Sequence, residues 1–282
     1  MSAFTQLLSP DSTLALNDGN RIPVLGFGVF QVREGSECEN AVRAALEAGY
    51  RHIDTAHIYG NEASVGKAVA ASGVPREKIF ITTKTPPDQS PQGLRKGLEN
   101  SLRLLRADYV DLYLIHWPLS DVTLAPAWEM LQQFRAEGKC RSIGVSNITV
   151  QRFEKALLPH TSVIPAVNQI EVHVFCRRRE LVDYCAGKGI VVEAYSPLAR
   201  AQRMGDPTLA RIAGECGVTP AQVMIRLVLQ HGIVALPKSS HPSRIKENCA
   251  VFGFSLSDAQ MAALDALDEE YYSLTWRPQG YY

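Results

Sequence analysis

Short apolar segments recur along the chain, with longer mixed segments between them. There are eight, each rich in Val, Ile, Leu or Tyr, and each is too short and too continuous for an amphipathic helix. Continuous apolar runs of this length are typical of parallel strands that are buried on both faces. The predicted strands are Val24–Val29, Arg51–Thr55, Ile79–Lys84, Tyr109–His116, Ser142–Ser146, Ala166–Glu171, Ile190–Tyr195 and Val234–Lys238.

The segments between these strands show helical spacing. Apolar residues recur at three- and four-residue steps on one face of two segments, Cys38–Ala45 and Leu94–Leu105. Capping side chains and first-turn prolines predict further helix starts. Those starts are Asn61-Glu62, Thr219-Pro220 and Ser257-Asp258, and the late helices are predicted over Pro207–Cys216, Pro220–Gln230 and Ser257–Leu267.

The alternation of eight strands with helices predicts an α/β fold, a (β/α)8 TIM barrel. We expect a single domain over residues 1–282, because no linker, charge block or low-complexity segment divides the chain. A doubly wound open sheet is the main alternative. That fold usually has a glycine-rich phosphate turn after its first strand, whereas Gly26-Phe27-Gly28 lacks the third glycine and an immediate helix. The barrel is therefore favoured.

Two appendages frame the predicted barrel. Residues 12–23 are predicted to form an N-terminal β-hairpin, with Asp18-Gly19 in a primed turn of positive φ. At the other end the chain continues into an extra C-terminal helix and an aromatic-rich tail. Between them, the run Arg177-Arg178-Arg179 is interpreted as a solvated helix start.

Composition and charge narrow the function classes. The chain has 282 residues, 46% of them hydrophobic and 21% charged, with 29 basic against 29 acidic side chains and a formal net charge of zero. A neutral globular chain is not expected to bind nucleic acid or a membrane surface through bulk charge. No apolar run is long enough for a membrane span, and no signal peptide is predicted. The six cysteines form no C-x-x-C pair, so we expect reduced, mostly buried thiols, no metal site and a cytoplasmic location.

Polar residues close several of the apolar strands. In a barrel these strand ends form the active-site rim, which would bring Asp54, Lys84 and His116 together with Tyr59 of the following loop. A phenol with an ordinary pKa of ~10 is a poor acid at neutral pH, but a Lys84 cation beside it would lower that pKa. Asp54 would hold the lysine, and His116 would orient a carbonyl oxygen. The set suits carbonyl reduction with a hydride from a cofactor. An alternative takes Lys84 as the Schiff-base lysine of an aldolase.

Seven segments together resemble the aldo-keto reductase family, in that family's order along the chain. The segments are GYRHIDTAHIYGNE, ITTK, DYVDLYLIHWP, IGVSN, VNQIE, YSPL and LPKSSHPSRIKEN. The short loops look most like the bacterial branch around the 2,5-diketo-D-gluconate reductases. The resemblance implies that Asp54, Tyr59, Lys84 and His116 are the catalytic tetrad, with Tyr59 as general acid in reduction.

The same resemblance implies a cofactor site for NADPH or NADP+. Ser146, Asn147 and Gln169 match residues that bind the nicotinamide carboxamide, and Tyr195 matches the ring that stacks on the nicotinamide. Lys and Arg side chains with a hydroxyl suit a 2′-phosphate, which favours NADPH over NADH. The remaining matching residues are Gly28, Ser196 and Leu198 near the pyrophosphate, Lys238, Ser239 and Arg244 at the 2′-phosphate, and Glu247 and Asn248 at the adenine.

The substrate is expected to be a small carbonyl compound, bound by a monomer in a fairly open pocket. Phe30, Ile58, Trp117 and Trp276 are predicted to line that pocket, which suits aldehydes and ketones, including α-dicarbonyls and keto-sugars. Three departures from the family pattern bear on specificity: Phe30 in place of Trp, the run Thr85-Pro86-Pro87, and His241 near the 2′-phosphate. The alternative function is an NADP(H)-binding sensor or structural protein without significant turnover.

Overall fold

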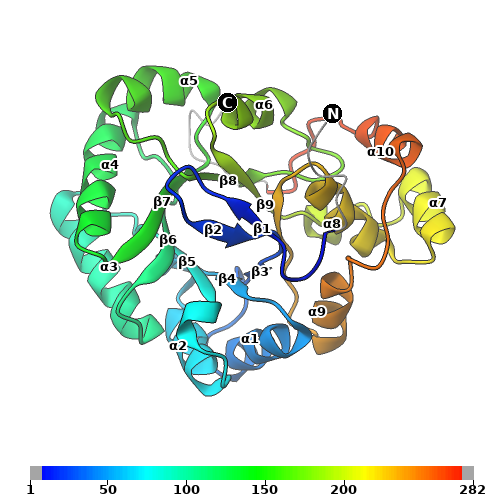
Figure 1. Ribbon diagram of the computed structural model, residues 1–282, viewed down its shortest axis with the longest axis horizontal. Helices are drawn as coiled ribbons and strands as arrows, with labels where there is room; N and C mark the ends of the chain where they lie inside the picture. The colour runs from blue at the N-terminus through cyan, green and yellow to red at the C-terminus, as the bar shows by residue number, and fades with distance from the viewer. Residues whose placement is uncertain (1–7, 275–282) are drawn as a thin grey trace.

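The computed structural model describes residues 8–274, and eight parallel strands form its centre (Figure 1). Neighbouring strands follow chain order, so each strand pairs with the next along the chain. The prediction of a TIM barrel is confirmed. The barrel strands are β3 (Phe27–Gly28), β4 (His52–Asp54), β5 (Phe80–Lys84), β6 (Val110–Ile115), β7 (Cys140–Ser146), β8 (Val167–Glu171), β9 (Val191–Tyr195) and β10 (Val234–Leu236).

Backbone hydrogen bonds between the first and last strands close the barrel. Leu25 and Ala235 form a parallel bridge, and the Gly26 N–H donates to the Ala235 carbonyl at 2.9 Å. Gly26 has to be glycine, because a Cβ there would lie 2.6 Å from Nδ1 of His52 inside the barrel. Closure removes the open sheet edges and brings the carboxyl ends of all the strands onto one rim.

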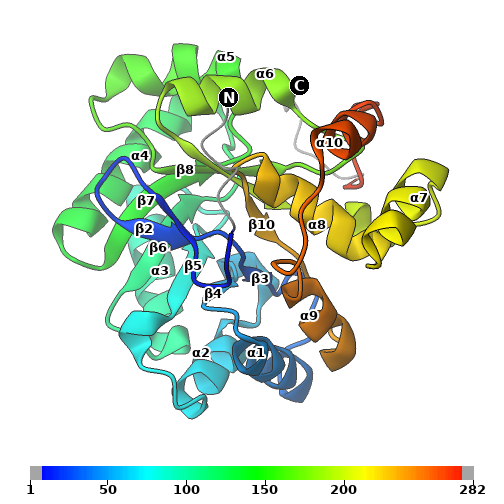
Figure 2. The same cartoon turned by 45° about the vertical axis from the view of Figure 1, so that its right-hand side comes forward.

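Helices surround the strands on the outside (Figure 1). The two helices predicted between β9 and β10, α7 (Pro207–Cys216) and α8 (Pro220–Gln230), are confirmed with the predicted bounds. Helix α7 lies beside the extra helix α10 (Asp258–Asp265) (Figure 2). That last helix is shorter than predicted by one residue at its start and two at its end. The helices are α1 (Ser36–Ala48), α2 (Glu62–Ala71), α3 (Pro91–Leu105), α4 (Asp121–Ala136), α5 (Val150–Arg152), α6 (Arg179–Gly187), α7 (Pro207–Cys216), α8 (Pro220–Gln230), α9 (Pro242–Cys249) and α10 (Asp258–Asp265), and the short 3-10 or π turns are η1 (His57–Tyr59), η2 (Arg76–Lys78), η3 (Phe153–Leu157), η4 (Leu158–His160) and η5 (Ala199–Ala201).

The N-terminal hairpin lies across the end of the barrel opposite the carboxyl ends of the strands (Figure 1). Its strands β1 (Thr13–Ala15) and β2 (Arg21–Pro23) are antiparallel, and the buried side chains of Leu16 and Ile22 pack inside the barrel with residues at the starts of strands. The predicted primed turn is wrong. Only Gly19 has positive φ, at 90°, which fits a three-residue loop with glycine in the left-handed position.

Of the three predicted capping side chains, two cap their helices and Asn61 does not. Thr219 and Ser257 do cap α8 and α10, each through a reciprocal capping box. Asn61 precedes α2 as predicted, but its side chain donates to the carbonyls of Val29 and Val32, both at 2.9 Å, so it ties loops together instead of capping the helix.

The arginine run before α6 is only partly solvated. Arg177 is 7% exposed, and its guanidinium pairs with Asp265 on α10. The interpretation of the whole run as a solvated helix start is therefore wrong at Arg177, because α10 packs over it. Within residues 8–274 no single helix is long and apolar enough to cross a membrane. Helices α7 and α8 would be long and apolar enough only if taken together, and they are bent by 87° relative to each other.

Candidate active site

The carboxyl ends of β4 and β5 place a buried ion pair at the rim of the barrel. Lys84 ends β5 with its side chain fully buried, and its Nζ lies 2.8 and 2.9 Å from the two carboxylate oxygens of Asp54 at the end of β4. The Thr55 carbonyl accepts a third hydrogen bond from Nζ at 2.9 Å. All three ammonium hydrogens thus have acceptors, as a buried charge requires.

Tyr59 and His116 complete the group. Tyr59 follows β4 in η1, and its hydroxyl lies 3.4 Å from Nζ of Lys84. The ring centroids of Tyr59 and His116 are 5.6 Å apart, edge to face, and the ring centroid of Phe30 lies 5.0 Å from that of Tyr59. The structure therefore brings all four predicted tetrad side chains together.

Burial and neighbouring charges both shift the pKa values of these side chains. For Lys84 burial opposes the charge, but Asp54 and Tyr59 outweigh it and raise the pKa. For Tyr59 burial raises the pKa and Asp54 adds to the rise, while Lys84 lowers it. The Lys84 charge thus lowers the Tyr59 pKa as expected, but burial and Asp54 outweigh it, so the pKa of Tyr59 is raised above its ordinary value. Burial and the Lys84 charge hold the pKa of His116 well below its usual range, so that imidazole is neutral.

The alternative of a Schiff-base lysine is disfavoured by the same facts. A Schiff base needs a neutral amine that can attack a carbonyl carbon. Lys84 has a raised pKa, its side chain is fully buried, and its ammonium is held by Asp54 and Thr55.

Amide and hydroxyl side chains form a second group beside the tetrad, at the ends of β7, β8 and β9. Ser146 donates through its hydroxyl to the Gln169 carbonyl at 2.8 Å, and Tyr195 donates to Oδ1 of Asn147 at 3.1 Å. Asn147 also donates to the His116 carbonyl at 3.1 Å, and its φ of 64° is a left-handed conformation that Asn tolerates better than most residues. The carbonyl contact links this group to the tetrad.

The buried polar side chains of Gln169, Glu193 and His52 lie inside the barrel and are called the barrel floor here. Sequence reasoning missed two of them, Glu193 and His52. Gln169 donates through Nε2 to Asp54 at 2.8 Å and to Glu193 on β9 at 3.0 Å. Burial and the Asp54 charge raise the pKa of Glu193 to about 8. Burial and the Lys84 charge lower the pKa of His52, on β4, to about 3. The available signal was a charged residue, Glu193, inside an otherwise apolar strand.

One cavity of about 980 Å³ connects these groups with the predicted cofactor residues. It is large enough for a dinucleotide site, and both cations and neutral donors line it. Of the sequence-predicted cofactor residues, it is lined by Gly28, Ser146, Asn147, Gln169, Tyr195, Ser196, Leu198, Lys238, Ser239, Arg244, Glu247 and Asn248.

Three of these residues have defined surroundings. Lys238 follows β10, and burial lowers its pKa. Asn248 lies buried on α9, and Glu247 accepts a hydrogen bond from the Thr219 hydroxyl at 2.8 Å. His241 does not line the cavity. It is exposed at the start of α9, and its backbone N–H donates to the Ser239 hydroxyl at 3.1 Å.

The cavity has apolar walls beside Tyr59. Phe30 and Ile58 are 40% and 48% exposed and line it together with Trp117, as predicted from the sequence. Trp276 lies outside the described residues. The last described residues, Ser273 and Leu274, also line the cavity, and the Ser273 backbone N–H and hydroxyl both donate to Glu171 at 2.6 Å.

Two further features adjoin the cavity. Thr85, the first residue of the unusual run after β5, accepts the His116 backbone N–H through its hydroxyl at 3.1 Å, so this departure from the family pattern supports the end of β6. Arg200, in η5, donates to the Gln31 side chain at 3.1 Å, and both residues line the cavity. Sequence reasoning missed these two contacts, because each joins residues that lie far apart in the chain.

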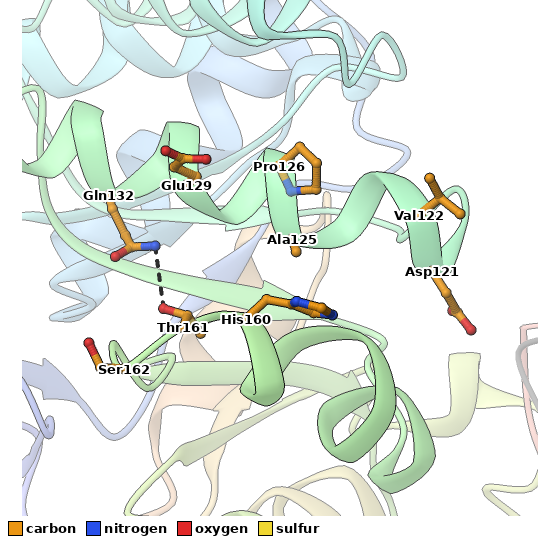
Figure 3. A pocket seen from close by; sticks show the side chains of 9 residues that line it. All are labelled: Asp121, Val122, Ala125, Pro126, Glu129, Gln132, His160, Thr161 and Ser162. Atoms are coloured by element: carbon orange, nitrogen blue, oxygen red, sulfur yellow. Dashed lines mark hydrogen bonds between the residues drawn. The ribbon is translucent and has the colours of Figure 1, made fainter.

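A second hollow lies on the outer surface between α4 and the segment from His160 to Ser162 (Figure 3). Gln132 of α4 donates across it to the Thr161 hydroxyl at 3.5 Å. None of the sequence-predicted site residues lines this hollow, so the candidate site is the cavity at the barrel rim.

Comparisons with known proteins show similarity to one enzyme family. The family model described as Aldo/keto reductase family matches residues 24–269. Over 259 residues the chain is 49% identical to an aldo-keto reductase of Mycolicibacterium vanbaalenii, covering 91% of this chain and 92% of that protein. It is 44% identical to the glyoxal reductase of Bacillus subtilis, covering 92% and 93%. The solved structure of MGS-M4, an aldo-keto reductase enzyme from a Medee basin deep-sea metagenome library, matches with a TM-score of 0.91 at 37% identity, covering 95% and 98%.

Proposed function

We propose that this chain, which belongs to the aldo/keto reductase family, uses NADPH to reduce aldehydes and ketones, with Tyr59 as the proton donor. Carbonyl reduction is the activity of the family. The observation that carries the finer assignment is the group of Asp54, Tyr59, Lys84 and His116 at one rim of the barrel, opening into the large cavity.

The four side chains divide the work on the carbonyl oxygen. Tyr59 holds the proton that the oxygen takes up, and the adjoining Lys84 cation stabilises the phenolate left behind. Asp54 keeps Lys84 charged in the buried site. His116 is neutral, so one ring nitrogen is available to donate a hydrogen bond that orients the oxygen without competing as an acid.

The nicotinamide cofactor, when bound, supplies the hydride that the side chains cannot provide. Asn147 and Gln169 are suited to hold its carboxamide, with Ser146 supporting Gln169, and the Tyr195 ring is suited to cover one face of the nicotinamide. Lys238 and Arg244 supply local positive charge for a 2′-phosphate, which supports NADPH over NADH. The fit rests on the donor set along one continuous cavity.

The proposed substrates are small aldehydes, ketones and α-dicarbonyl compounds. Phe30, Ile58 and Trp117 give the cavity an apolar wall beside Tyr59, which favours compact apolar groups on the carbonyl carbon. The named relative from Bacillus subtilis is a glyoxal reductase, which supports α-dicarbonyls in particular.

A screen of NADPH oxidation tests the proposal. The purified protein is mixed with NADPH and, in separate reactions, an aliphatic aldehyde, an aromatic aldehyde, an α-dicarbonyl, a keto-sugar and a keto-ester. We expect quenching of NADPH fluorescence on binding and steady oxidation with the α-dicarbonyl and the aldehydes. The proposal fails if the protein neither quenches the fluorescence nor oxidises NADPH with any of them.

A further inference from the structure

A buried carboxyl group on the barrel floor, that of Glu193, has no role in the reaction as described so far. Glu193 is fully buried on β9, and the strand register sets it directly beside Gln169 of β8. Its Oε2 accepts the Gln169 amide at 3.0 Å, while Oε1 has no hydrogen-bond partner within residues 8–274. Burying a carboxyl group in this way is costly, so its place beside a cofactor-facing amide calls for a reason.

The contacts of Gln169 fix which way its amide points. The same atom, Nε2, lies 2.8 Å from Asp54 and 3.0 Å from Glu193. An amide oxygen at this position would face the Asp54 carboxylate without a hydrogen, so the NH2 group has to occupy it. Both amide hydrogens are then used on the floor. The amide oxygen of Gln169, its Oε1, accepts no hydrogen bond from the described residues. Gln169 also lines the cavity.

We infer that Glu193 is a positioning residue for the cofactor: it accepts the second hydrogen of the Gln169 amide and thereby keeps Oε1 of Gln169 as a fixed acceptor for the carboxamide N–H of nicotinamide. This inference rests on the proposed use of NADPH and on the proposed contact of Gln169 with the carboxamide. Asp54 alone cannot fix the amide, because one unpaired N–H in a buried place would turn toward the cavity to find a partner.

The charges around Glu193 are compatible with this role. Asp54 and Lys84 form an ion pair, and His52 is neutral, with its Nε2 bonded to the Thr82 hydroxyl at 2.9 Å and 3.7 Å from Glu193. Burial and Asp54 favour the neutral form of Glu193 near neutral pH, and a neutral carboxyl group still accepts through its carbonyl oxygen. The floor therefore supplies an acceptor without adding a second negative charge beside Asp54.

The test compares two oxidised cofactors by calorimetric titration, without turnover. One is NADP+, and the other is its acetylpyridine analogue, in which a methyl group replaces the amide nitrogen and removes the N–H donor. We expect the wild-type protein to bind NADP+ about tenfold more tightly than the analogue, the value of one buried hydrogen bond. In Glu193→Leu that preference should fall below about threefold, through weaker binding of NADP+ alone.

Three further variants make the result specific. Glu193→Gln keeps an acceptor for Gln169 and should restore the preference of the wild type. Glu193→Val also removes the acceptor, with a shorter side chain, and repeats the test if the leucine variant does not fold. Glu62→Leu removes another buried carboxylate, one that binds Thr83 and Ser101 in the outer layer and does not line the cavity, and it should leave the preference unchanged.

The outcomes separate this inference from the proposed function. If the wild-type protein binds neither cofactor, the proposed function itself fails. If the wild type binds both equally, or if folded Glu193→Leu keeps the full preference, the positioning role is wrong while NADPH use stands. If neither Glu193→Leu nor Glu193→Val folds, Glu193 is required for folding and the inference is overturned.

Discussion

Lys84 is a fully buried cation, and its neighbours determine what it can do for Tyr59. Burial works against the charge of Lys84 and also against ionisation of the Tyr59 phenol. Asp54 keeps Lys84 charged by pairing with its Nζ. The negative charge of Asp54 also opposes ionisation of the Tyr59 phenol and so raises its pKa. Lys84 therefore limits the rise in the Tyr59 pKa that burial causes. Its charge stabilises Tyr59 most once the phenolate has formed.

Removing the cation tests this balance. In Lys84→Met, Asp54 is left as an unpaired buried carboxylate, so the free energy of unfolding at neutral pH should fall by about 3 kcal/mol or more. Turnover should fall by about 100-fold or more, because the Tyr59 phenolate loses its counter-charge. Denaturant titration and NADPH oxidation measure the two effects.

The double variant Asp54→Asn/Lys84→Met is the matched control. It removes both charges, so it should recover most of the lost stability and none of the lost activity. Equal stability of Lys84→Met and the wild type would mean that the ion pair does not set the protonation of the site.

The buried carboxyl of Glu193 predicts a pH dependence of stability. Its pKa is raised from an ordinary 4.5 to about 8, so the folded chain keeps a proton that the unfolded chain releases between those values. Stability from this group is complete below pH 4.5 and is lost as the pH rises through about 8. Between about pH 5 and pH 8 the wild type should lose about 3 kcal/mol relative to Glu193→Gln. Parallel stability curves for the two proteins over that range would contradict this assignment.

At the scale of elements, β10 and α9 carry the local positive charge of an otherwise neutral chain. Lys238 follows β10, and Arg244 lies in the first turn of α9, a helix that begins with Pro242. Both side chains line the cavity. The zero net charge therefore coexists with a cationic segment suited to one phosphate group.

Neutralising that segment should change the cofactor preference. In Arg244→Gln the affinity for NADPH should fall by about 10- to 100-fold while the affinity for NADH stays the same, since only NADPH has the 2′-phosphate. Fluorescence titration with each cofactor measures this. Arg43→Gln, on the exposed face of α1, removes an arginine away from the cavity and should change neither affinity. A parallel loss of both affinities in Arg244→Gln would remove the phosphate assignment.

The elements themselves follow closely from sequence patterns, and the side-chain contacts between them do not. Strands and helices were predictable because burial on both faces and capping at Thr219 and Ser257 are local signals. Asn61 has an equally good capping signal, but the loops around Val29 and Val32 claim its side chain. A local pattern cannot show that competition, because the competing carbonyls lie about thirty residues away.

At the scale of the whole molecule, the barrel is closed at one end and open at the other. The hairpin fills the closed end with Leu16 and Ile22, and the cavity with the candidate site occupies the open end. The sequence predicted the barrel, the hairpin and the rim residues, because these depend on strand order. It did not predict the Glu193 contact with Gln169, or the direction of the Tyr59 pKa, because both depend on burial inside the closed barrel.

The closed end should contribute stability without affecting the site. Ile22→Ala removes a fully buried side chain from the barrel interior, and the free energy of unfolding should fall by about 3 kcal/mol. Ile22→Val, as the milder control, should cost about 1 kcal/mol. NADPH affinity of both folded variants should match the wild type. A large loss of affinity would mean that the two ends of the barrel are coupled.

The central claim is hydride delivery to a carbonyl carbon that Tyr59 protonates on oxygen. The most direct measurement follows deuterium from NADPH carrying deuterium at both positions of nicotinamide C4 into the alcohol formed from an α-dicarbonyl, for the wild type and for Tyr59→Phe. We predict deuterium on the former carbonyl carbon with the wild type. Tyr59→Phe should still bind NADPH, but it should form product more slowly by a factor of about 100 or greater. An alcohol without deuterium, or a Tyr59→Phe variant that turns over at the wild-type rate, would contradict the account.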